Sequence, residues 1–141
     1  MSGVPEHAPG PLAGLKVLEL GDGVAGAAAA DVLAALGADV TTVMAADSVL
    51  RALHPQVSGV SLLSAVLDSR KHALPAAGRD ELAGRIAAAD VVICDRVHMA
   101  AAELPGSSAD YLSFVAAHNR AVWVTVSTFG LAGSNADLSP C

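Results

Sequence analysis

Aromatic residues are scarce in this chain of 141 residues: they make up 3% of it, whereas hydrophobic residues make up 53%. A core must therefore be built from Ala, Val and Leu, which suits helices packed closely on a parallel sheet. Cysteine is also scarce, and the two present, Cys94 and Cys141, provide no disulfide framework. Cys94 stands among apolar residues, so we expect it in the core or at a strand end.

Two further absences concern location and partners. No apolar run approaches the ~18 residues of a membrane-spanning helix. Residues 1–10 contain neither the positive region nor the apolar region of a signal peptide. We therefore expect a cytoplasmic protein that has no membrane partner.

Positive charge is in short supply as well. Lys and Arg number 8 against 14 Asp and Glu, a formal net charge of −6. The only basic cluster is Arg70-Lys71-His72, so nucleic acid is not an expected partner. The five histidines show no metal-binding spacing, and we predict no metal site. If the chain binds an anion, backbone groups must do most of the holding.

The strongest pattern lies in residues 15–44. An apolar run over 15–20 leads into Gly21, Gly23 and Gly26, which form a G-x-G-x-x-G loop. An alanine-rich stretch over 24–36 follows, and then a β-branched run over 39–44. This order predicts a strand, a tight turn, a helix and a second strand, the opening of a nucleotide-binding type of α/β domain. Such a turn brings backbone N–H groups and a helix N-terminus close to a ligand, which favours an anion.

Strand-like and helix-like segments alternate along the rest of the chain. We expect helices near 47–54, 58–67, 79–88, 98–104 and 107–119, an extended segment at 71–74, and strands at 90–95 and 121–127. The predicted fold is α/β: a Rossmann-like open parallel sheet of about four main strands flanked by helices. The predicted domains are a leader (1–13), a Rossmann-like domain (14–130) and a loop or truncated tail (131–141). We expect the chain to be the N-terminal portion of a larger protein.

A series of short phrases resembles the N-terminal third of the family III CoA-transferases, the group of formyl-CoA transferase, carnitine CoA-transferase and α-methylacyl-CoA racemase. The phrases are PLAGLKVLEL at 11–20, VAG at 24–26, LGADV at 36–40, RKH at 70–72, ADVVI at 89–93 and VTVSTFG at 124–130. The resemblance implies interlocked homodimers that move CoA between carboxylic acids through an aspartyl anhydride, or epimerise acyl-CoA. The partners would be an acyl-CoA and a carboxylic acid. CoA or acyl-CoA would be a substrate and not a permanently bound cofactor.

The resemblance also implies where CoA would bind. CoA would lie near the first strand–helix turn, and the nucleophilic aspartate would lie downstream of the matched region. We therefore assign no catalytic residue here and expect the chain alone to be inactive. The predicted CoA-binding residues are Asp22, Gly23, Val24, Ala25, Arg70, Lys71, Asp95 and Arg96.

Five of these residues also have a purely structural interpretation. Asp22 is equally suited to capping the helix that follows it. Arg70 and Lys71 suit phosphate, but they would also serve as a solvated surface pair. Asp95 and Arg96 follow a parallel strand, at the edge where open α/β sheets hold ligands, yet a mutual ion pair explains them too.

Several positions depart from the family pattern. Met44-Ala45-Ala46 stands where the family usually has an acidic residue, often followed by basic ones. Cys94-Asp95 replaces a common Glu-Asn, and Glu103 stands where Arg or Lys often occurs. CoA would therefore bind weakly, or the domain would serve a non-catalytic structural or dimerisation role. A dinucleotide-binding module is a third hypothesis, although the acid expected after its second strand is missing.

Overall fold

A five-stranded sheet forms the centre of the structure, a computed structural model that describes residues 10–21, 23–44, 48–76, 78–95, 104–105 and 107–136. Every neighbouring pair in the sheet is parallel. The α/β class and the open parallel sheet are therefore confirmed. In spatial order the strands are β5 (His72–Pro75), β2 (Asp39–Met44), β1 (Lys16–Leu20), β6 (Val91–Asp95) and β7 (Val122–Val126).

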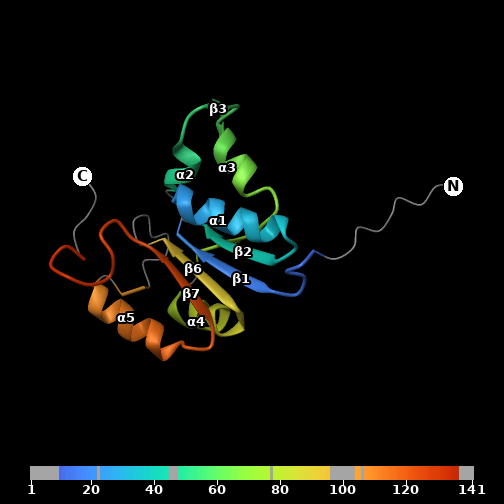
Figure 1. Cartoon of the computed structure of the whole chain (residues 1–141). Coiled ribbons are helices and arrows are strands. Elements are labelled where there is room, and N and C mark those ends of the chain that lie inside the picture. Colours follow the sequence, from blue (N-terminus) through green and yellow to red (C-terminus); the bar gives the residue numbers. More distant parts are fainter. Residues whose placement is uncertain are drawn as a thin grey trace.

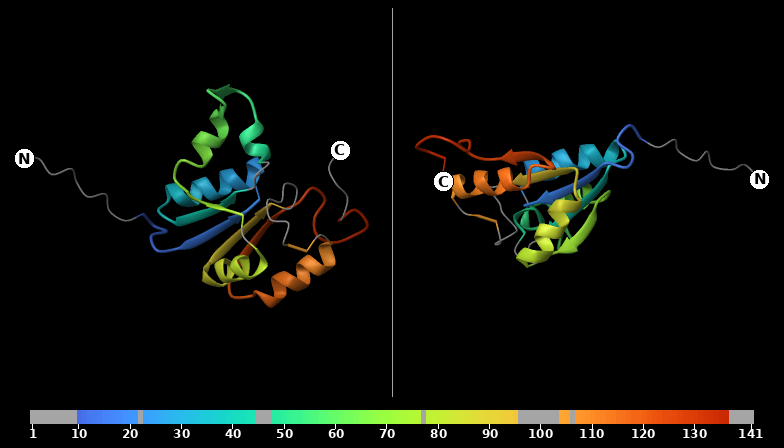
Figure 2. Two further views of the ribbon diagram at one scale, coloured as in Figure 1. Left: turned by 180° about the vertical axis from the view of Figure 1, so that it is seen from behind. Right: turned by 90° about the horizontal axis from the view of Figure 1, so that it is seen from below.

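Helices cover both faces of this sheet, as Figure 1 shows. One face carries α1 (Val24–Ala35), and the other carries α4 (Arg79–Ala88) and α5 (Ser108–Ala117). A smaller lobe stands beyond α1 and is seen from two further sides in Figure 2. The lobe consists of α2 (Val49–Ala52), an antiparallel hairpin of β3 (Gln56–Val57) and β4 (Val60–Ser61), and α3 (Leu62–Leu67).

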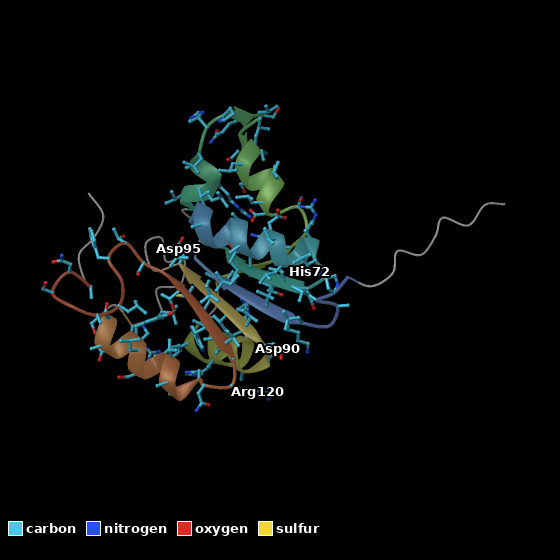
Figure 3. All side chains as sticks on the ribbon, viewed as in Figure 1. His72, Asp90, Asp95 and Arg120 are labelled. Carbon is cyan, nitrogen blue, oxygen red and sulfur yellow. The ribbon has the colours of Figure 1, made fainter. Side chains whose placement is uncertain are left out.

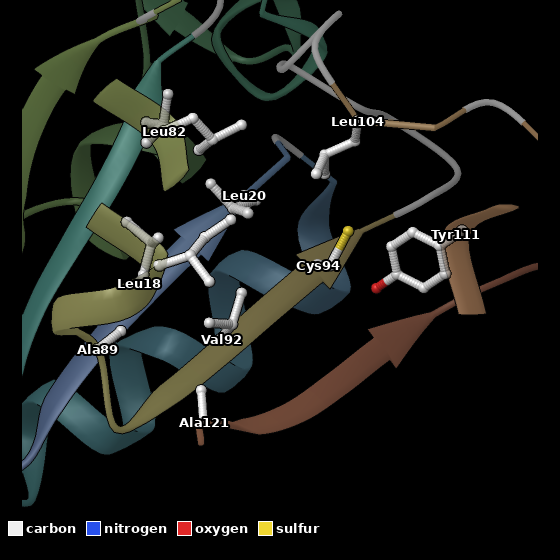
Figure 4. Close-up of a cluster of buried hydrophobic side chains, with 11 residues drawn as sticks. Leu18, Leu20, Leu82, Ala89, Val92, Cys94, Leu104, Tyr111 and Ala121 are labelled. Atoms are coloured by element: carbon white, nitrogen blue, oxygen red, sulfur yellow. The ribbon is translucent and has the colours of Figure 1, made fainter. Parts of the chain in front are cut away.

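The central strands are buried on both sides because their side chains alternate between the two faces. Val17 and Ile93 pack with Ala30 of α1. Their strand neighbours Leu18 and Val92 point the other way, into the larger cluster under α4 and α5 that Figure 4 shows. Cys94 belongs to this second cluster and is fully buried, which confirms its predicted place in the core.

The helix predicted over 58–67 is wrong in its first part. Ser58 and Gly59 have φ angles of 52° and 79° and form the tight turn of the β3–β4 hairpin. Helix α3 begins only at Leu62, after Ser61 caps it by accepting a hydrogen bond from the Ser64 N–H. A turn that needs two positive φ angles cannot continue a helix. The residues around it are apolar, so the pattern in the sequence conceals the turn.

The sheet also has one strand more than the four main strands expected. The extended segment predicted at 71–74 is the edge strand β5, which pairs with β2 alone. All four of its residues are exposed, so the sequence has no hydrophobic alternation there to mark it as a strand. The other helices and strands lie close to their predicted bounds. The helix predicted at 98–104 falls almost entirely outside the described residues.

The predicted domain boundaries stay predictions, but two contacts bear on them. Within the predicted leader, the Leu12 N–H donates to the carbonyl of Leu36, the C-cap of α1, at 3.1 Å, so this residue is bonded to the end of that helix. Within the predicted tail, the Ala136 carbonyl accepts a hydrogen bond from Ser108 Oγ at 3.2 Å. No helix in the described ranges is both long enough and apolar enough to span a bilayer.

Candidate functional site

The strand order creates a switch point between β1 and β6. The connection that leaves β1 runs through α1 on one face of the sheet, whereas the connection that leaves β6 runs through α5 on the other. Ligands of open α/β sheets bind outside the carboxyl ends of the strands at such a point. Gly21 follows the end of β1 and Asp95 ends β6, so the structure brings the glycine loop and Asp95 to this one place.

Among the described residues, none gives the N-terminus of α1 the side-chain cap that three other helices have. Ser48, Ser61 and Ser107 each accept a backbone hydrogen bond at the start of α2, α3 and α5. The N-cap of α1 is Gly23, and no described side chain caps this helix or places an acid in its first turn. The first N–H groups of a helix have no partner inside it and carry partial positive charge. The first turn of α1 is therefore a suitable place for an anion.

Asp95 lies against this same turn. Its side chain is buried at 3% exposure. A Cβ on Gly26 would meet the Asp95 Cβ at 3.4 Å and its Oδ2 at 3.8 Å, so the glycine gives the carboxylate room beside α1. Figure 3 shows Asp95 near one end of β6 and Asp90 near the other. A bound anion would share the positive end of α1 with this carboxylate, which limits the affinity that the turn can provide.

Lys71, predicted as a phosphate contact, is buried beneath α1. Its ammonium Nζ donates to Glu19 Oε2 at 2.8 Å and to the Ala27 carbonyl at 3.0 Å, and it lies 3.6 Å from Asp68 Oδ1. The exposed fractions of the Lys71 and Glu19 side chains are 0% and 3%. The phosphate contact stays a prediction, and the structure shows a competing role inside the protein.

Glu19 is a site residue that the sequence reasoning missed. Burial raises the pKa of its carboxyl above the ordinary value of 4.5, and the hydrogen bond from Lys71 offsets only part of that rise. The signal was present in the sequence, because Glu19 interrupts the apolar run of β1 and shares a face of the strand with Val17, which packs on α1. A charge on the buried side of a strand needs a partner.

Arg70 behaves differently from its neighbour. Its Nη1 bonds Asp31 Oδ1 at 2.9 Å on α1, and 54% of its side chain is exposed. The basic pair of the sequence is therefore split into one exposed cation and one buried cation. A third cation, Arg51 of α2, lines a cavity of about 20 Å³ together with Gly21 and Glu19. That volume suits about one water molecule, so a larger ligand would lie over this edge and not inside it.

Two predicted residues, Asp22 and Arg96, lie outside the described residues, and their contacts stay predictions. Gly23, Val24 and Ala25 form the cap and the first turn of α1, where Val24 and Ala25 are exposed. Within the described ranges, no three His, Cys, Asp or Glu side chains gather in a group that could hold a metal ion.

Comparisons with known proteins show the family and the fold of the chain. The sequence model of CoA-transferase family III matches residues 12–140. No curated protein sequence matches the chain.

Several solved structures have the same fold. A CAIB/BAIF family protein from Brucella suis superposes with a TM-score of 0.71 at 23% identity, over 94% of this chain and 37% of its own. Rv3272 from Mycobacterium tuberculosis superposes with a TM-score of 0.65 at 19% identity, over 95% of this chain and 38% of its own. A point mutant of Rv3272 gives 0.67 at 18% identity, over 94% and 37%. At such identities the likeness shows the fold, and the chain spans under two fifths of these relatives.

Proposed function

Since this chain belongs to CoA-transferase family III, we propose that it is a CoA-binding domain whose ligand lies at the first turn of α1. The family match over residues 12–140 carries the proposal. The helix end at the switch point, which no described side chain caps, supports it, because that is where an open α/β sheet offers N–H groups to a phosphate. In the parent protein, the domain would serve the transfer of CoA between carboxylic acids through an aspartyl anhydride, or the epimerisation of acyl-CoA, in a cytoplasmic homodimer.

The charges around the turn predict weak binding. CoA carries several phosphate charges, whereas the chain has a net charge of −6 and places Asp95 beside the same turn. Arg51 and Arg70 are the exposed cations on the α1 side of the sheet that we expect to help. Each missing charge-assisted hydrogen bond typically forfeits about 1.5–3 kcal/mol. We therefore expect a dissociation constant no tighter than about 100 μM.

Catalysis is a separate question from binding. Acyl transfer through an anhydride needs a carboxylate that is positioned to attack the acyl-CoA. Of the buried carboxylates in the described ranges, Glu19 is held by Lys71, and Asp95 lies against α1. We assign neither as the nucleophile and propose that the 141 residues bind CoA without transferring it.

A matched pair of variants tests the site. Ala25 and Ala35 are both exposed alanines of α1, one in the first turn and the other at the last residue. Ala25→Asp should weaken CoA binding in calorimetry by about tenfold or more, because a carboxylate would occupy the positive helix end. The same carboxylate favours the helix itself, so loss of fold would not explain the result. Ala35→Asp adds equal charge far from the turn and should change affinity by less than about threefold. Equal losses in both variants would place CoA elsewhere.

One observation favours the alternative of a structural or dimerisation domain. The lobe of α2, β3, β4 and α3 exposes six large aliphatic side chains, a composition typical of protein interfaces. They are Val49, Val57, Val60, Leu62, Leu63 and Val66, each 37–60% exposed. A chain that self-associates without binding CoA would support this alternative. The dinucleotide-binding hypothesis gains no such support.

A further inference from the structure

We infer that Lys71 and Glu19 are positioning residues: a buried ion pair that holds the first turn of α1 in place for its ligand without touching that ligand. The inference rests on the proposed function for its ligand, but its structural part stands on the contacts alone. It changes the role that the sequence indicated for Lys71, from a surface contact to a support beneath the turn.

The three contacts of Lys71 lie on three separate parts of the fold. A lysine ammonium has three N–H donors. Here they face Glu19 on β1, the Ala27 carbonyl in α1 and Asp68 in the turn before β5. Asp68 is itself held by Ser64 of α3, whose Oγ donates to Asp68 Oδ2 at 2.9 Å. One buried atom thus ties the central strand, the ligand-facing helix and the segment leading to the sheet edge.

The bond to Ala27 links this network to the candidate site. The Ala27 N–H donates to the Gly23 carbonyl, so Ala27 closes the first turn of α1. Its carbonyl is the point at which Lys71 holds that turn relative to β1. The N–H groups of residues 24–26 belong to the same turn, and hydrogen bonds weaken steeply when their distance or angle departs from the optimum. Release of Ala27 should therefore disturb the groups that would face CoA.

The burial of Lys71 argues that it supports the first turn of α1 and does not contact the ligand. The Lys71 side chain is 0% exposed, so a phosphate would reach it only if the helix moved away and the ammonium left Glu19. Arg70, one residue earlier, has the same charge but a 54% exposed side chain bonded to Asp31. The two residues therefore form a matched comparison between a buried cation and an exposed one.

The double variant Glu19→Met/Lys71→Met tests whether the ion pair positions the first turn of α1 or only stabilises the fold. Replacing both partners of a buried pair by apolar groups of similar size is often neutral or stabilising, so the variant should fold. We expect amide hydrogen exchange of residues 27–30, whose N–H groups are bonded inside α1, to become about tenfold faster while residues 82–86 of α4 keep their rates. CoA affinity should fall about tenfold, whereas Arg120→Met, which removes an exposed cation at the other end of the sheet, should change it by less than about threefold.

The possible results of these experiments lead to different conclusions about the ion pair and about the CoA site. A folded double variant with normal exchange at 27–30 would overturn the inference, because the pair would then only stabilise the fold. If Ala25→Asp leaves CoA binding intact, the proposed site is wrong, and the exchange rates still decide whether the pair positions the turn.

If the double variant does not fold, Glu19→Gln replaces it. This variant keeps the bond from Lys71 to Ala27, so exchange at 27–30 should stay within about threefold of the original, and a tenfold rise would contradict the role given to that bond.

Discussion

Lys71→Met should lower the free energy of unfolding by about 3–5 kcal/mol near neutral pH, because it leaves the buried Glu19 carboxylate without a cation and close to Asp68. Arg70→Met removes the same charge one residue away, from a side chain that is 54% exposed. Its cost should stay below about 1 kcal/mol, as for most surface ion pairs. Urea unfolding of both variants measures the difference.

Glu19→Gln should cost less than Lys71→Met. The lysine keeps the Ala27 carbonyl and Asp68 as partners in that variant, so no buried charge is left alone. We expect a loss of about 0.5–1.5 kcal/mol, the worth of an ordinary hydrogen bond. Equal losses of stability in Glu19→Gln and Lys71→Met would contradict this expectation, because Lys71 would then need Glu19 as much as Glu19 needs Lys71.

The effect of Lys71→Met should depend on pH. Because burial raises the pKa of Glu19, its contribution to stability is fully present below the unfolded value near 4.5 and is lost as the pH rises through the folded value. Removing Lys71 also removes the hydrogen bond that holds this pKa down, so the loss becomes larger as the pH rises. The gap between the original chain and Lys71→Met should therefore be small near pH 4.5 and wide near pH 7.5. A gap of constant size would mean that lost packing, and not the charge, explains the effect.

The second large effect is expected at Tyr111, which is 0% exposed. Its ring meets the edge of Trp123 at a centroid distance of 6.2 Å, and its hydroxyl shares a 2.8 Å hydrogen bond with Thr125 Oγ1. Tyr111→Ala should cost about 3–5 kcal/mol, because it opens a cavity between α5 and β7. Tyr111→Phe keeps the ring, and its loss should be about 1 kcal/mol.

Trp123 is the only tryptophan of the chain, so its fluorescence reports directly on this region during unfolding. A Tyr111→Ala variant within about 1 kcal/mol of the original chain would show that α5 does not pack on β7 as described. Three of the four aromatic residues, Tyr111, Phe114 and Trp123, meet here. The scarcity of aromatics elsewhere makes this cluster the largest concentration of ring packing in the described core.

The parts of the fold that the sequence predicted are those where local chemistry and tertiary packing agree. In residues 15–44 the apolar run, the glycine loop and the alanine-rich stretch all indicate the same strand, turn and helix, and α1 and its two flanking strands form there. The edge strand β5 was only partly anticipated. Its residues are exposed, and its strand geometry comes from pairing with β2, which leaves no hydrophobic pattern.

The site was predicted less completely for a physical reason. Strand-end rules place Asp95 and the glycine loop at one edge of the sheet, and the structure brings them together. These strand-end rules do not predict which side chains from different helices and strands come into contact. The sequence therefore grouped Lys71 with Arg70, its neighbour in the chain, although Lys71 is paired with Glu19 across 52 positions of sequence. Burial, which separates these two cations, is a property of the fold.

The central claim, that the first turn of α1 binds CoA, is tested most directly by adding CoA to the labelled protein and following its backbone amides by nuclear magnetic resonance. The account predicts that the largest shifts fall on residues 21–26 and on Asp95, and that they saturate on the order of 100 μM. Residues 117–121, which line a cavity at the other end of the sheet, should stay unchanged. Shifts confined to that second region, or no shifts at millimolar CoA, would contradict the account.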